Sequence, residues 1–154
     1  MKNFDEYIQR TVRMFTHPVW FVIRDEARKC PCVDHDSKQA KDDCQICFGT
    51  GNKVSLARVK ASNQNASVSY RGTGMAYGEK DIVNVYYTEN PTDIKPGDIV
   101  YDHKDLDIVT DVYYERSDSS DIVYWRIETV PLKNNPNIIR QNLKKVLREA
   151  GYDE

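Results

Sequence analysis

The sequence predicts a mainly β, α+β fold: a small antiparallel β-barrel or sandwich with an inserted zinc knuckle and helices at the N- and C-termini. Three observations support this prediction. Short runs of β-branched and aromatic residues recur in the second half, separated by turns rich in Pro, Gly, Asn and Asp. Apolar residues at helical spacing occur near both ends, and all four cysteines lie in one polar stretch. A length of 154 residues fits a single domain over 1–154.

The first expected element is an amphipathic helix over residues 3–15. Its apolar residues recur at offsets of four, four and three, which places them on one helical face; they are Phe4, Ile8, Val12 and Phe15. Pro18 marks the end of this helix, because the residue before a proline disfavours helical backbone. The apolar run 19–23 then predicts a buried strand.

Residues 25–51 form a polar excursion that contains the cysteines and has too little apolar content to order itself. A β-rich core over 53–131 follows. Its expected strands are 53–61, 82–87, 98–101, and the hairpin pair 106–114 and 122–130. Residues 62–80 are crowded with Ser, Asn and Gly, which predicts a long loop and a candidate interface.

A C-terminal helix is expected within 134–150. Pro136 suits a first helical position and Gly151 suits the C-cap. One face carries Ile139, Leu143, Val146 and Leu147, with a basic stripe of Arg140, Lys144 and Arg148 beside it. A solvated face explains this stripe better than nucleic-acid contact. The helix is a second candidate interface.

Composition narrows the function classes. The formal net charge of −2 argues against a dedicated nucleic-acid binder, which would show a strong basic excess. The ten tyrosines fit either strand packing or an interface. The longest apolar run is far shorter than the roughly 20 residues of a membrane span, and the N-terminus resembles no signal peptide. A reducing cytosol is therefore expected, where clustered cysteines favour metal binding over disulfides.

The cysteines form two close pairs, Cys30 with Cys32 and Cys44 with Cys47. Two such pairs joined by a loop supply the four thiolates of a tetrahedral zinc site. Gly49 and Gly51 follow the second pair, where tight turns direct backbone N–H groups at thiolates. These four cysteines are the predicted metal ligands, and Zn²⁺ is the predicted cofactor.

Other interpretations of the cysteines stay open. An iron–sulfur cluster also uses four cysteines. Disulfides are disfavoured in the cytosol, and a bridge within Cys30-Pro31-Cys32 would be strained. His35 could replace one thiolate, although a solvent-exposed histidine is the simpler interpretation. A catalytic zinc needs an open position, whereas four thiolates close the site. We therefore interpret the metal as structural.

The sequence offers no further chemistry that we interpret as catalytic. His17 and His103 lie near no recognisable nucleophile motif, and His103 lies in a charged turn between strands. The acidic residues near it, Asp102, Asp105 and Asp107, lack the glycine and glutamate positions of a calcium loop. Residues 71–74, Arg-Gly-Thr-Gly, are too short for a phosphate-binding loop. No catalytic residue and no enzyme activity are expected.

Two resemblances add to this interpretation. Residues 44–51, Cys-Gln-Ile-Cys-Phe-Gly-Thr-Gly, resemble the knuckle of DnaJ-type zinc domains, but those repeat it four times and this chain has it once. The second resemblance is to small virion proteins of tailed bacteriophages. It rests on the order of four features: the 18–24 strand, Cys-Pro-Cys, the knuckle, and a β-rich half with Lys-Pro-Gly-Asp at 95–98. Among these virion proteins, the similarity is to the head-closure or head–tail connector (neck) proteins.

This resemblance implies a non-enzymatic virion subunit, made in the host bacterial cytoplasm and assembled as a homo-oligomeric ring around the DNA channel. The partners it implies are neighbouring virion proteins on the portal or tail side, passive contact with DNA, and no membrane. The zinc knuckle or the 62–80 loop would dock onto those neighbours. Two alternatives remain: a zinc-dependent nucleic-acid-binding module, and a metalloenzyme with an open metal position.

Overall fold

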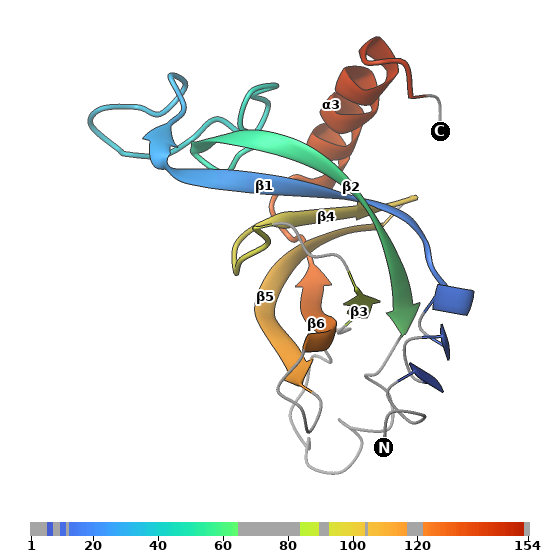
Figure 1. Cartoon of the computed structure of the whole chain (residues 1–154). Coiled ribbons are helices and arrows are strands. Elements are labelled where there is room, and N and C mark those ends of the chain that lie inside the picture. The colour runs from blue at the N-terminus through green and yellow to red at the C-terminus, as the bar shows by residue number, and fades with distance from the viewer. Residues whose placement is uncertain are drawn as a thin grey trace, which may run out of the picture.

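The computed structural model describes residues 6–7, 10–11, 13–64, 84–89, 93–103, 105–116 and 122–152. In this part of the chain, six strands form a closed ring of antiparallel pairings, and a helix packs against its outside (Figure 1). The mainly β prediction is confirmed. The elements are β1 (His17–Lys29), β2 (Asn52–Gln64), β3 (Asn84–Thr88), β4 (Ile99–Asp102), β5 (Asp105–Arg116), β6 (Ile122–Pro131) and α3 (Pro136–Glu149).

The strands follow one another around the ring in the order β1-β2-β3-β6-β5-β4. The short strand β4 closes it, because Trp20 of β1 pairs with Tyr101 of β4. The predicted hairpin of 106–114 and 122–130 is confirmed, since β5 pairs with β6 along most of its length. Each of the other strands expected after the cysteines overlaps an observed one. Of the expected 82–87 strand, residues 82–83 lie outside the described residues. Of the expected 62–80 loop, Ser62–Gln64 belong to β2, and residues 65–80 lie outside the described residues.

Residues Val19–Ile23 of β1 are buried on both faces of the strand, which explains their unbroken apolar run. Successive side chains of a strand point to opposite faces. Val19 and Phe21 therefore lie inside the ring, while Trp20 and Val22 face α3. The interior cluster consists of Val19, Phe21, Ile23, Val59, Ala61, Tyr86, Ile94, Val100, Val109 and Ile127.

Helix α3 covers the outer face of β1 and β4 with Ile139, Leu143 and Leu147, so the predicted apolar face is confirmed. Pro136 stands in its first turn, as expected. The helix ends in a Schellman motif around Gly151, whose φ is +94°. The Gly151 N–H donates to Arg148 O at 3.0 Å, and the Tyr152 N–H donates to Leu147 O at 2.9 Å. The Tyr152 ring then meets Trp20 edge-on, with centroids 4.9 Å apart.

The predicted N-terminal helix is described only in part. Residues 6–7, 10–11 and 13–14 have helical backbone. Phe15, the last residue of the expected helix, lies in a turn rather than in the helix and is 64% exposed. Phe4, Ile8 and Val12, the other members of its expected apolar face, lie outside what the structure describes. No helix among the described residues combines the length and the apolar character that crossing a bilayer requires.

Candidate metal centre

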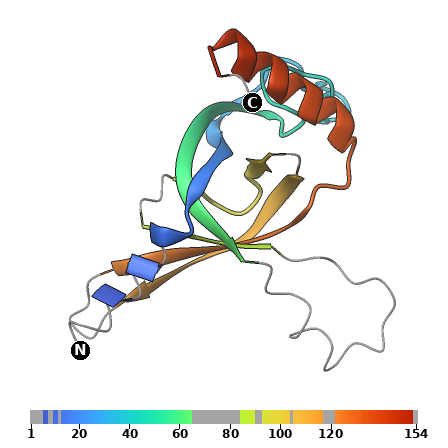
Figure 2. The same ribbon diagram turned by 90° about the vertical axis from the view of Figure 1, so that its right-hand side faces the viewer.

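The cysteines lie in the connection between β1 and β2, over residues 30–51, hereafter the cysteine segment. β1 continues to Lys29, which pairs with Asn52, so the segment departs from the sheet five residues later than the sequence suggests. The Cys30 N–H donates to Gly51 O at 2.9 Å and closes the base of the segment. The segment lies at the end of the molecule opposite the helical residues that precede β1 (Figures 1 and 2).

The four cysteine sulfurs converge. The Sγ atoms of Cys30 and Cys44 are 3.7 Å apart, those of Cys32 and Cys47 are 3.4 Å apart, and all four lie within 4.8 Å of one another. All four are free thiols. Four thiolates around a tetrahedral zinc, each about 2.3 Å from the metal, would lie about 3.8 Å from one another. The donor set and its spacing therefore fit one metal ion. Exposed His35, the alternative ligand, does not belong to this group.

The turn after the second pair orients the sulfurs. Phe48 and Gly49 have φ values of +52° and +83°, in the left-handed region. This conformation reverses the chain directly after Cys47 and favours the glycine that the sequence supplies. The Phe48 N–H donates to Cys44 O at 3.1 Å, and the Ile46 N–H approaches Cys44 Sγ at 3.4 Å. The Ile46 N–H is thus aimed at the Cys44 sulfur, and the N–H groups of Gly49 and Gly51 are aimed at the Cys47 sulfur, as the sequence predicts.

The cysteine thiols differ in acidity. At Cys44, burial acts to raise the pKa, but the N–H groups of Cys47 and Ile46 and the neighbouring thiols outweigh it and bring the pKa to about 7. Burial dominates at Cys47 and raises its pKa to about 12, against N–H groups of Gly51 and Gly49. Because a metal binds thiolates, Cys44 is the side chain best prepared to capture it.

The cysteine segment is packed onto α3. Phe48 is buried beside Ile139 in the cluster beneath the helix. Asn142 of α3 donates from Nδ2 to Asp43 O at 3.1 Å. A second side chain, Asn135 at the start of α3, donates to the Asp42 carboxylate. The four cysteines therefore lie on a support formed by the β1–β2 hairpin and the helix.

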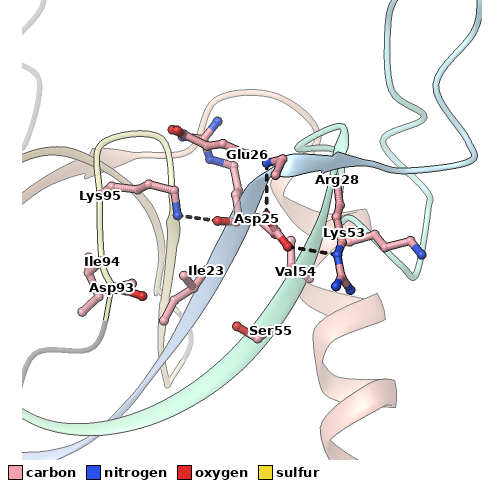
Figure 3. Close-up of a pocket in the computed structure, with 12 residues that line it drawn as sticks. Ile23, Asp25, Glu26, Arg28, Lys53, Val54, Ser55, Asp93, Ile94 and Lys95 are labelled. Carbon is pink, nitrogen blue, oxygen red and sulfur yellow. Dashed lines mark hydrogen bonds and ion pairs between the residues drawn. The ribbon is translucent and has the colours of Figure 1, made fainter.

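A groove runs beside β1, where Arg24–Arg28 face residues 93–95 (Figure 3). Several of its lining charges are engaged with neighbouring groups. Arg28 pairs with Asp25 at 3.4 Å, and the Lys95 ammonium donates to Arg24 O. Asp98, fully buried behind the groove, accepts hydrogen bonds from the Arg24 N–H at 3.0 Å and Arg24 Nε at 3.2 Å. This network fixes the Lys-Pro-Gly-Asp turn against β1.

The tyrosines include both buried and exposed residues, so strand packing accounts for some of them. Tyr86 and Tyr101 are almost fully buried, whereas Tyr113 and Tyr114 on β5 are about half exposed. On the exposed hairpin, the Arg126 guanidinium lies over the Tyr113 ring, and Tyr114 contacts Trp125.

The chain matches no protein-family model, and no curated protein matches its sequence.

Proposed function

We propose that the protein is a non-enzymatic structural subunit of a tailed-bacteriophage virion, a head–tail connector (neck) protein that assembles as an oligomeric ring. In this proposal, Cys30, Cys32, Cys44 and Cys47 hold one Zn²⁺ that stabilises a docking segment. The observation that carries it is the convergence of four thiols, and no other ligand type, on a projecting segment. Four thiolates complete the coordination of zinc, so the ion would cross-link the polypeptide and leave no position for substrate.

The placement of the cysteine segment supports a docking role. It projects from the ring between the end of β1 and the beginning of β2, and α3 supports it from one side (Figure 1). Polar side chains dominate its surface, and Ile46, between two of the cysteines, is an exposed apolar residue. A cross-linked projection loses little conformational entropy on binding, which favours assembly with a neighbouring subunit. The near-neutral charge suits a subunit that lets DNA slide past it.

The oligomeric state of the purified protein tests whether the chain assembles as a ring. We expect the zinc-loaded full chain to give a single closed multimer by native mass spectrometry and annular particles by negative-stain electron microscopy. Cys44→Ser should weaken this assembly, whereas the exposed His35→Asn in the same segment should not. Wild-type protein that stays monomeric over a wide concentration range, with zinc bound, would contradict the ring.

A zinc-dependent nucleic-acid-binding module is the second candidate, and the exposed β5–β6 hairpin favours it. Tyr113 with Arg126, and Tyr114 with Arg116, pair an aromatic ring with a guanidinium, and such pairs stack on single-stranded bases. Glu128 also pairs with Arg126, which weakens the positive field there. Fluorescence anisotropy with single-stranded DNA distinguishes the nucleic-acid-binding module from the virion subunit. Tight binding that weakens steeply with salt, and that Tyr114→Ala reduces, would favour the nucleic-acid module.

A further inference from the structure

A second group of metal-binding side chains lies where β1 begins and β4 turns into β5. His17 is the first residue of β1, Asp102 is the last residue of β4, and His103 follows in the turn. His17 Nε2 lies 2.8 Å from Asp102 Oδ1, and His103 Nε2 lies 3.8 Å from the same oxygen. One ligand atom from each of the three residues lies within 4.8 Å of the others.

The carboxylate is held in place from behind. The Tyr86 hydroxyl donates to Asp102 Oδ2 at 3.3 Å, and Asn63 Nδ2 approaches the same oxygen at 3.5 Å. These contacts direct Oδ1 toward the two imidazoles. The Asp102 side chain is only 6% exposed, whereas His17 is 32% exposed and His103 is 76% exposed. A buried carboxylate thus forms the floor of a site that opens to solvent through the histidines.

An ion pair alone does not account for this arrangement. His17 at 2.8 Å satisfies Asp102 Oδ1, and His103 at 3.8 Å is too distant to add a hydrogen bond. Yet the two imidazole rings lie nearly parallel, with centroids 5.5 Å apart and an interplanar angle of 11°. Of the three histidines in the chain, two therefore meet at one carboxylate, from positions about 85 residues apart in sequence.

We propose that His17, Asp102 and His103 bind one divalent transition-metal cation of the Zn²⁺, Co²⁺ or Ni²⁺ class. Imidazole and carboxylate are ordinary ligands for these ions, and three protein ligands leave positions for water. Metal–ligand bonds of 2.0–2.2 Å place ligand atoms roughly 3–3.5 Å apart, and the observed 2.8 and 3.8 Å lie on either side of this range. Tyr86 and Asn63 supply the outer hydrogen bonds that orient the carboxylate. Unlike the cysteine site, this site is open and exchangeable.

Cobalt titration of the full chain tests the proposal. The protein is first loaded with one equivalent of Zn²⁺, which the four thiolates take preferentially, and Co²⁺ is then added. We expect one further equivalent to bind, with weak visible d–d absorption and without the strong thiolate-to-cobalt charge-transfer absorption. His103→Asn removes one ligand while retaining a residue that tolerates the left-handed φ of +53° at this turn. His17→Gln removes the second imidazole.

Each of these two variants should weaken Co²⁺ binding at the second site about tenfold or more. His35→Asn, which replaces the remaining histidine, should leave that affinity unchanged. Because His103 is exposed, His103→Asn should keep the wild-type melting curve, which separates lost binding from lost folding. Wild-type affinity in His103→Asn would overturn the proposal. So would the absence of a second equivalent in wild-type protein, or its loss in His35→Asn. None of these readouts depends on the oligomeric state.

Discussion

Asn135 donates its side-chain hydrogen bond to the carboxylate of Asp42 and leaves the first turn of its own helix uncapped. It occupies the N-cap of α3 with φ 49° and ψ 50°, and its side chain makes no capping bond. An asparagine at this position ordinarily bonds to a backbone N–H of the helix. Here it joins α3 to the cysteine segment, between the two cysteine pairs. The candidate metal site and the helix are therefore mechanically connected.

A double-mutant cycle measures this connection. Asp42→Ala removes the acceptor, and Asn135→Gly removes the donor while allowing the positive φ. Each change should lower the free energy of unfolding by about 0.5–1.5 kcal/mol, because each breaks the same hydrogen bond. The double variant should lose less than the sum of the two, as measured by chemical denaturation. Additive losses would show that the pair does not interact in solution.

Loss of the metal should spread to α3. Cys44→Ser should abolish tight metal binding, and hydrogen-exchange mass spectrometry should show faster exchange in residues 30–51 and in α3. Strands of the ring that do not contact α3, such as β6, should stay protected, because the buried side chain of Ile127 packs in the separate interior cluster. Ile46→Ala is the matched control, since Ile46 is exposed within the same turn. Uniform exchange along the whole chain, or unchanged α3, would contradict this expectation.

The sequence predicts the elements whose signals are local. α3 follows from its apolar spacing together with Pro136 and Gly151, and the cysteine site follows from two close pairs. The extension of β1 through the mostly charged residues 24–29 could not be predicted from composition. It depends on pairing with β2 at Arg24 and Lys29, on either side of an irregularity in the register. Likewise, the sequence alone leads to the interpretation of His103 as a solvated turn residue. Its proximity to His17 in space becomes apparent only when β1 pairs with β4.

Two glycines with similar backbone angles should tolerate alanine differently. Gly97 has φ +93°, and a Cβ there would lie 2.6 Å from the Arg24 guanidinium; Gly151 has φ +94°, and nothing lies within 4 Å. Gly151→Ala should lower the free energy of unfolding by about 1–2 kcal/mol, the cost of left-handed backbone for a residue with a Cβ. Gly97→Ala should cost more, because Arg24 would have to leave Asp98. Thermal denaturation compares them, and Arg24→Ala should remove the difference. Equal losses in the wild-type background would refute the steric argument.

Asp107 gives the fold a pH dependence of known sign. Its carboxylate accepts hydrogen bonds from Asn84 at 2.6 Å and Thr129 at 2.8 Å, but burial dominates and raises its pKa. The folded state therefore holds this proton more tightly than the unfolded state. The resulting stability is fully present below the unfolded pKa and is lost as pH rises through the raised folded pKa.

Asp107→Asn should remove that contribution. The difference in unfolding free energy between wild type and Asp107→Asn should shift in favour of the variant as pH rises from mildly acidic to neutral. Comparing the two proteins at each pH cancels the protonation of the cysteines, which they share. A difference that stays constant with pH would mean that the pKa of Asp107 is the same in the folded and unfolded states.

The burial of β1 on both faces has a consequence during synthesis. β2 follows soon after it and can pair with one edge, but β4, which pairs with the other edge, and α3, which covers the outer face, emerge much later. A nascent chain that has reached only β3 therefore presents an apolar strand with an open edge, the kind of surface that joins chains together. Until β4 has been synthesised, association between nascent chains competes with closure of the ring.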